Sequence, residues 1–167
     1  MDAAPFDGWS GSWHISLDDD AAVYGIQIEF PLPDGALHAA HAKVPRGDPP
    51  FTIVHEAGTL TLDGAPGERS GAATFSPNAS VAEQWRARLG RALTDDEQLC
   101  NALFDVTLDF DTGFRALFPR ATPQNEVEAR VFGADLALLR EVAAANPNAT
   151  PRDVTIAAMR RRRERGR

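Results

Sequence analysis

The sequence predicts an α+β fold, in which a small antiparallel β-sandwich or partly open barrel precedes short helical repeats. Two observations lead to this prediction. Apolar and polar residues alternate with a period of two in several short runs before residue 76, which is typical of half-buried strands. After that point Thr94, Thr122 and Thr150 stand 28 residues apart, and so do many residues that follow each of them. A fixed period of roughly 20–50 residues indicates stacked supersecondary units.

The strands come first in the chain. We expect them over residues 11–17, 23–30, 37–44, 51–56, 59–63 and 71–75, separated by turns rich in Asp, Gly and Pro. Five or six short antiparallel strands at regular spacing favour a sandwich or a partly open barrel. The positions expected to face its core are Trp13, Ile15, Leu17, Tyr24, Ile26, Ile28, Phe30, Phe51, Ile53, Leu60 and Leu62.

A first helix should follow the last strand. Ser80 and Glu83 have the spacing of a capping box, in which each side chain bonds the backbone N–H of the other residue. Val81, Trp85 and Leu89 then form one apolar stripe that ends at Gly90. Trp85 is the residue expected to pack the helices against the sheet.

Each repeat opens with a helix-start signal. Thr94 and Glu97 form a second capping-box pattern, and Pro follows Thr122 and Thr150 at the first helical position. Gly133 predicts a helix end, with a second helix over residues 135–145. In the first repeat Asp105 takes the place of that glycine, which favours one longer or bent helix over residues 94–118. We expect the repeats to cover the open face of the sheet.

Composition narrows the class of protein. The chain has 167 residues and a net charge of −7, with an acidic N-terminus that lacks a signal-peptide pattern and with no apolar run long enough to span a bilayer. These features predict a cytoplasmic protein. The domain boundaries that we expect are a loose lead-in over residues 1–10, a β-domain over 11–76, a helical segment over 77–159 and an Arg-rich tail over 160–167.

The tail is the clearest electrostatic feature. Residues 160–167 carry six Arg and one Glu, or +5, which leaves −12 on residues 1–159. One interpretation is a solvated helix end. The other is a docking segment for an anionic membrane surface or an acidic protein patch. Nucleic acid is not expected as a partner, because the acidic body would repel phosphates. The predicted docking residues are Arg160, Arg161, Arg162, Arg163, Arg165 and Arg167.

No catalytic, cofactor or metal signature is recognisable in the sequence. His38 and His41 are too close in sequence and lack a third ligand at zinc spacing. The acidic residues Asp105, Asp109 and Asp111 are expected on the solvated face of a helix. Cys100 is expected to be a small buried residue with no histidine paired to it. We therefore expect no catalytic residues, no cofactor and no metal, and so a non-enzymatic protein.

Several motifs are similar to those of a module found in uncharacterised bacterial proteins, some of them regions that follow the membrane segments of BlaR-type peptidase sensors. They are residues 56–59 (EAGT), residues 71–78 (GAATFSPN) and the Thr-Pro repeat starts, so that the resemblance covers roughly residues 50–155. That module usually carries His where this chain has Phe104 and Phe132. The resemblance implies the architecture and an interaction role, without a known activity.

The function that we expect is that of an accessory or stabilising subunit, which docks on a larger, membrane-bound complex at the cytoplasmic face. A photosynthetic reaction-centre–antenna complex would be one instance. The alternative is a small-molecule-binding barrel, because Gly11-Ser12-Trp13 is similar to the Gly-x-Trp that opens lipocalin-type barrels. A third reading, a hydrolase that uses the Asp cluster, would need a cleft.

Overall fold

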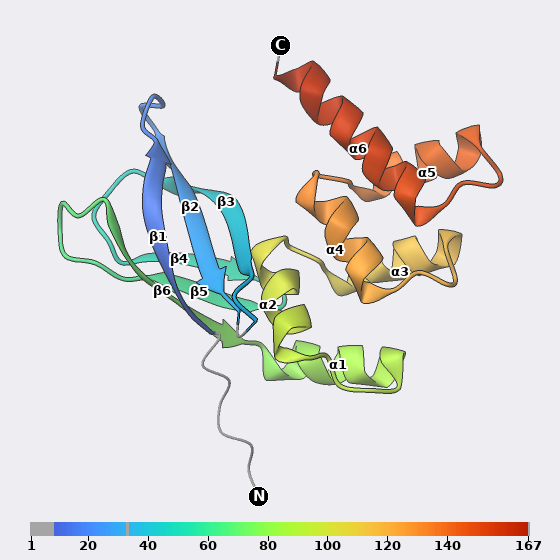
Figure 1. Cartoon of the computed structure of the whole chain (residues 1–167), viewed down its shortest axis with the longest axis horizontal. Helices are drawn as coiled ribbons and strands as arrows, with labels where there is room; N and C mark the ends of the chain where they lie inside the picture. Colours follow the sequence, from blue (N-terminus) through green and yellow to red (C-terminus); the bar gives the residue numbers. More distant parts are fainter. Residues whose placement is uncertain (1–8, 33, 167) are drawn as a thin grey trace, which may run out of the picture. The chain divides into compact units, whose positions relative to one another are not determined.

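The computed structural model describes residues 9–32 and 34–166, and in this part of the chain six strands precede six helices (Figure 1). Most of the lead-in predicted over residues 1–10 lies outside the described residues. The strands are β1 (Ser10–Leu17), β2 (Val23–Pro31), β3 (Leu37–Pro45), β4 (Phe51–His55), β5 (Gly58–Leu62) and β6 (Ser70–Pro77). They form one antiparallel sheet in the order β3-β2-β1-β6-β5-β4, which leaves β3 and β4 at its edges.

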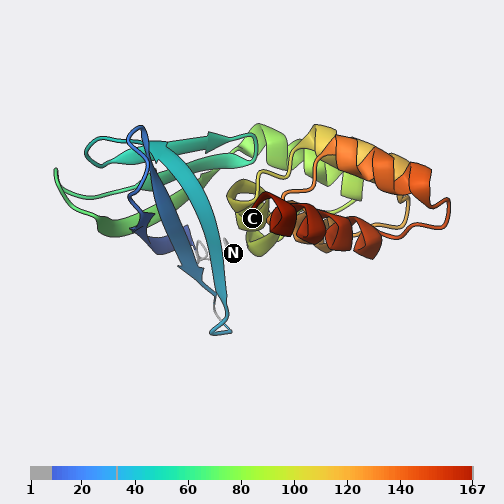
Figure 2. The same ribbon diagram turned by 90° about the horizontal axis from the view of Figure 1, so that it is seen from above.

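The sheet curls into a partly open barrel, which confirms the predicted α+β class (Figure 2). Phe51 on the edge strand β4 packs edge-on against Trp13 of β1, with 5.5 Å between the ring centroids. It also contacts Tyr24 of β2, at 6.3 Å. In the sheet β4 is a neighbour of neither β1 nor β2, so only a strongly curled sheet brings its ring to the other two. The aromatic cluster thus fixes the curvature.

The concave face of the sheet carries the core that the alternating pattern predicts. Ile26, Ile28 and Phe30 alternate along β2 and are fully buried, as is Trp13 on β1. Leu17 was expected in this core but is 63% exposed. The pairing of β1 with β2 shifts register between Ile15 and Leu17, so the alternation breaks before the strand ends.

The indole of Trp13 lies close to the backbone of Asp63. Trp13 Nε1 donates to the carbonyl oxygen of Asp63, at 2.8 Å. Gly71, paired with Trp13 in the sheet, lies directly beside this bond. A Cβ at position 71 would stand 1.9 Å from the same carbonyl oxygen and 2.9 Å from Nε1. Only glycine fits there, because any side chain would force the two strands apart.

Helices α1 (Ala79–Leu89) and α2 (Asp95–Leu103) follow the sheet. The N-cap of α1 is Asn78, whose side-chain oxygen accepts from the backbone N–H groups of Ser80 and Val81. The predicted capping box at Ser80 is therefore wrong. The second capping box is confirmed: Thr94 and Glu97 each accept from the backbone N–H of the other. Helix α2, the first helix of the repeats, packs against β5 and β6.

The remaining helices are α3 (Leu108–Leu117), α4 (Pro123–Val131), α5 (Leu136–Ala145) and α6 (Pro151–Arg165). The longer or bent helix predicted over residues 94–118 is wrong, because the chain forms two separate helices with a break after Leu103. Asp105 adopts φ +52°, and its repeat counterpart Gly133 adopts φ +81°. Both are left-handed conformations, which Asp tolerates better than most residues with a side chain. The Asp thus terminates its helix as the Gly does.

The chain divides into two compact units, with the division after Leu103. The first contains the sheet, α1 and α2, and we call it the sheet unit. The second contains α3 to α6, and we call it the helical unit. In the helical unit α3 packs on α5, and α6 packs on both α4 and α5. The first 28-residue repeat is therefore split between the units, because its leading helix α2 belongs to the sheet core.

Among the residues that the structure describes, none of the helices combines the length and the apolar composition that crossing a membrane requires.

Candidate functional site

The predicted docking arginines lie at the end of an ordered helix. Helix α6 continues to Arg165, whereas its last buried residue is Ala158. Arg161 pairs with Glu141 of α5. Within the described part of the chain the other four arginines of this segment are exposed and form no ion pair: Arg160, Arg162, Arg163 and Arg165. Arg167 lies outside the described residues. The helix thus presents a cationic end beyond its packed part, which we call the arginine arm (Arg160–Arg165).

The acidic residues of the helical unit divide into two environments. Asp109 is exposed, as expected for a solvated helix face. Asp111 is buried, which contradicts that expectation, and it pairs with Arg115 one turn later on α3. Glu126 of α4 is fully buried beside this pair, with its Oε1 3.3 Å from Arg115 Nη2. We call Asp111, Arg115 and Glu126 the buried acid cluster.

The buried acid cluster holds two carboxyl groups and one guanidinium group. Burial away from water raises the pKa of Glu126 to about 8, and the neighbouring Asp111 carboxylate adds to that rise, while Arg115 opposes it. Glu126 is thus mostly protonated at neutral pH and can donate a hydrogen bond to Asp111. The cluster ties α3 to α4 inside the packed unit. Because its two carboxyl groups lie away from solvent, we assign the cluster a structural role.

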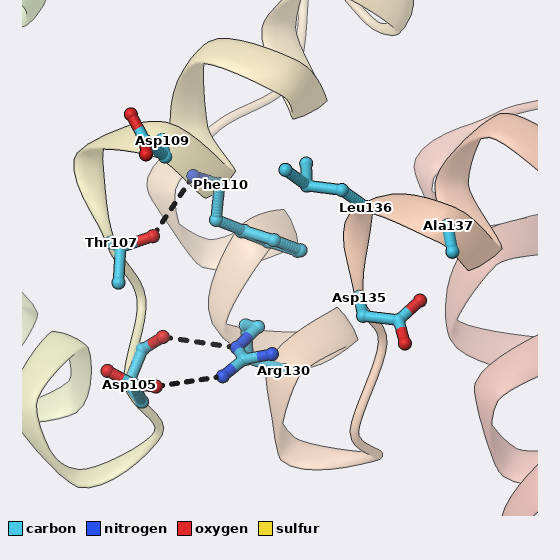
Figure 3. A pocket seen from close by; sticks show the side chains of 8 residues that line it. All are labelled: Asp105, Thr107, Asp109, Phe110, Arg130, Asp135, Leu136 and Ala137. Atoms are coloured by element: carbon cyan, nitrogen blue, oxygen red, sulfur yellow. Dashed lines mark hydrogen bonds and ion pairs between the residues drawn. The ribbon is translucent and has the colours of Figure 1, made fainter.

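A pocket of about 400 Å³ lies in the helical unit, and Figure 3 shows its lining. It is lined by Asp105, Thr107, Asp109, Phe110, Arg130, Asp135, Leu136 and Ala137. Among these lining residues Arg130 is the only basic one. The carboxylate groups of Asp109 and Asp135 point away from this arginine (Figure 3). Asp135 is the N-cap of α5 and accepts from the N–H of Leu138.

The guanidinium group of Arg130 donates most of its hydrogen bonds to backbone carbonyl oxygens. Its Nε donates to the carbonyl oxygens of Phe104 and Asp105, at 3.2 and 3.1 Å, and its Nη1 donates to that of Ala134, at 2.9 Å. Its Nη2 pairs with the Asp105 carboxylate, and the guanidinium lies over the Phe110 ring. Arg130 therefore joins the two left-handed breaks of the repeats. This use of its N–H groups leaves the pocket without a cation free to hold an anionic ligand.

The sheet unit contains a group of metal-ligating side chains that sequence analysis missed. His38 Nε2 on β3 lies 2.5 Å from Asp96 Oδ1 and 3.3 Å from Cys100 Sγ, both on α2. The three ligand atoms all lie within 4.8 Å of one another. We call these residues the His-Asp-Cys cluster. The expectation that no histidine pairs with Cys100 is therefore wrong, as is the expectation that His38 lacks further ligands nearby.

The three residues differ in their exposure. Cys100 is buried, as predicted, whereas the side chains of His38 and Asp96 are 25% and 48% exposed. Burial raises the pKa of the Cys100 thiol to about 12, and the charges of Asp96 and Glu97 add to the rise. The thiol is thus protonated in the metal-free protein and is a poor nucleophile. The one signal in the sequence was the spacing of Asp96 and Cys100, which puts both on one helix face.

A histidine from each edge strand of the sheet contacts helix α2. His38 stands on the edge strand β3, and His55, the last residue of the other edge strand β4, places its Nδ1 2.5 Å from the carbonyl oxygen of Ala102. The helix therefore lies between the two unpaired edges. Its polar contacts with both edge strands help to hold the partly open barrel in its curled form.

Comparisons with family models, with curated proteins and with solved structures returned no match. The similarity to the module of BlaR-type sensors stays a prediction.

Proposed function

We propose that this protein is a non-enzymatic interaction module that docks through the arginine arm on an anionic surface of a larger, membrane-bound protein complex. The observation that supports this is the position of four exposed arginines on an ordered helix, beyond its last buried residue Ala158. Within the described residues they have no acidic partner on the chain itself, so their charge is available to another molecule.

The charge distribution supports the same proposal. The sheet unit carries fifteen acidic and six basic residues, or −9, whereas the helical unit carries nine acidic and eleven basic residues, or +2. Most of the positive charge of the helical unit lies in its last eight residues. An anionic surface attracts the arginine arm and repels the acidic sheet unit, so this charge distribution favours docking through the arm.

An ordered helix also favours docking over a purely solvated end. Val154 and Ala158 anchor α6 by packing against its neighbours, and Asp153 accepts from both the N–H and the hydroxyl of Thr150 at its start. The arginines are therefore presented by a helix that is already formed, and binding orders only their side chains. Such preorganisation reduces the entropic cost of association.

Two of the earlier expectations stay predictions. One is the particular partner, a photosynthetic reaction-centre–antenna complex. The other is the ligand-binding barrel. Large side chains fill the concave face of the sheet, including Trp13, Phe30 and Leu62, and a ligand in the barrel would have to displace some of them.

The test compares sedimentation of purified protein with membranes washed from cells that naturally produce it. Beside the full chain we would use a chain that ends at Met159 and the triple variant Arg160→Gln, Arg162→Gln, Arg163→Gln. The matched control, Arg120→Gln, Arg140→Gln, Arg152→Gln, removes the same charge from exposed positions of the same unit. Each basic residue near an anionic surface contributes about 1 kcal/mol, so the triple variant should bind roughly 100-fold more weakly.

The proposal predicts that only the first two variants lose binding, and that salt weakens binding of the full chain. Protease treatment of the membranes should abolish binding, because the partner is a protein complex. Equal binding to protein-free anionic vesicles would instead assign the arm to lipid. Equal loss in the matched control would contradict a specific role of the arginine arm.

A further inference from the structure

Three metal-ligating atoms of different kinds converge between β3 and α2. A histidine nitrogen comes from the edge strand, and a carboxylate oxygen and a thiol sulfur come from two residues one turn apart on the helix. The spacing of Asp96 and Cys100, four residues, places both side chains on the helix face that meets His38. None of these three residues belongs to the arginine arm.

His38 Nε2 can form a good hydrogen bond with only one of the two polar atoms that face it. His38 Nε2 faces both Asp96 Oδ1 and Cys100 Sγ, and a neutral or protonated ring carries at most one proton on that nitrogen. If Nε2 is protonated, the proton can point well toward only one of the two atoms. If it is not, it can accept from the thiol but then faces the carboxylate, another acceptor. A cation shared by the three atoms removes this conflict.

We infer that the His-Asp-Cys cluster binds one Zn²⁺ ion, or a similar transition-metal ion, through His38 Nε2, Cys100 Sγ and an oxygen of Asp96. In tetrahedral zinc sites the bond lengths are about 2.0–2.3 Å, which puts neighbouring ligand atoms about 3.3–3.6 Å apart. The sulfur–nitrogen separation of 3.3 Å lies at the lower end of this range. The Asp96 oxygen, at 2.5 Å from Nε2, must move outward, and its half-exposed side chain has room to do so.

The donor set selects the class of metal. Sulfur and imidazole ligands favour zinc and its transition-metal relatives over Mg²⁺ and Ca²⁺, which prefer oxygen ligands. The neighbouring carboxylate of Glu97 is not available as a further ligand, because it accepts from the backbone of Thr94 and pairs with Arg91. The three side chains thus leave a fourth coordination position for water or for a donor from another molecule, as in open zinc sites.

A bound ion would fasten the edge strand β3 to the helix that lies between the two edges of the sheet. Among the side-chain hydrogen bonds of the described residues, only those of His38 join β3 to α2, through Asp96 and Cys100. Metal binding should therefore stabilise the sheet unit, since a ligand that binds only the folded state raises the melting temperature.

The test uses Co²⁺ as a spectroscopic substitute for Zn²⁺ on the reduced full chain. The expected result is one Co²⁺ per chain, with the charge-transfer absorption that a cobalt–thiolate bond produces, and its disappearance when one equivalent of Zn²⁺ is added. Cys100→Ser should abolish that absorption. His38→Gln and Asp96→Asn should weaken Zn²⁺ binding by at least the roughly 10–100-fold that the loss of an outer-shell partner costs.

The matched control is His41→Gln, on the same strand but exposed, which should leave metal binding unchanged. Because the side chain of Asp96 is half exposed, Asp96→Asn tests the site without removing core packing. In the wild-type protein Zn²⁺ should raise the melting temperature, and in Asp96→Asn it should not do so at the same concentration. The inference is overturned if the folded, reduced chain shows no thiolate absorption with excess Co²⁺, or if His41→Gln weakens binding as much as His38→Gln.

Discussion

Replacement of Glu126 by Gln should change how the stability of the protein depends on pH. Glu126 is fully buried between Asp111 and Arg115 of α3, and its pKa is raised to about 8 by burial and by the Asp111 carboxylate. Gln has nearly the shape of a protonated Glu and can donate to Asp111 in the same way, but it does not titrate. The variant therefore keeps the packing of the buried acid cluster and removes one proton equilibrium.

The sign and the size follow from linkage. In the unfolded chain Glu126 should have its ordinary pKa of 4.5, so between pH 4.5 and 8 the folded state holds a proton that the unfolded state has released. The contribution of this group is fully present below pH 4.5 and is lost as the pH rises toward 8. A difference of one bound proton changes the free energy of unfolding by about 1.4 kcal/mol per pH unit, so from pH 5 to pH 7 the wild type should lose about 3 kcal/mol relative to Glu126→Gln.

The assay is urea unfolding at a series of pH values, followed by far-ultraviolet circular dichroism, with the free energy of unfolding of each variant compared with that of the wild type. The comparison cancels the titration of groups outside the buried acid cluster, which both proteins share. The matched control is Glu128→Gln, an exposed carboxyl two residues further along α4, whose curve should run parallel to that of the wild type. If the curve of Glu126→Gln is also parallel to the wild type between pH 5 and 8, the account of the buried acid cluster is refuted.

Two further predictions concern glycines. Gly71→Ala should destabilise the sheet unit by about 3 kcal/mol or more, because the new Cβ would overlap the Asp63 carbonyl oxygen and disturb its bond from Trp13; thermal unfolding of the full chain measures this loss. Gly133→Ala should cost about 1 kcal/mol, because the site has free space but a left-handed backbone; urea unfolding measures it. Gly47→Ala, with free space and an ordinary backbone, is the control for both and should change stability little.

Local sequence patterns predicted most of the architecture. Alternation along β2 identified Ile26, Ile28 and Phe30 as core residues, and the Thr-based caps located the starts of the repeat helices. These features are local, since they depend on strand pleat, helix period and capping within a few residues. The break at Asp105 was missed because a left-handed conformation is expected for Gly first, and Asp adopts it less often.

Long-range contacts were the part that the sequence did not reveal. His38 lies 58 residues before Asp96 and 62 before Cys100, and no local rule brings β3 and α2 together. The contact of Glu126 with Arg115 joins two helices, and no local rule predicts it either. The pattern of α3 alone favoured a solvated position for Asp111, which is buried beside this contact. The arginine-rich segment, in contrast, was evident from the composition of the sequence. The structure added that residues 160–165 belong to an ordered helix.

Site-specific photo-crosslinking would show whether the arginine arm contacts a protein partner in the cell. A photoreactive amino acid would replace Glu164, an exposed residue among the arginines of α6, and in a parallel strain the exposed Arg120 of the same unit. We expect a discrete crosslink from position 164 to a subunit of a membrane-bound complex, and none from position 120. If position 164 gives no protein crosslink, or the same products as position 120, the docking function proposed for the arm is contradicted.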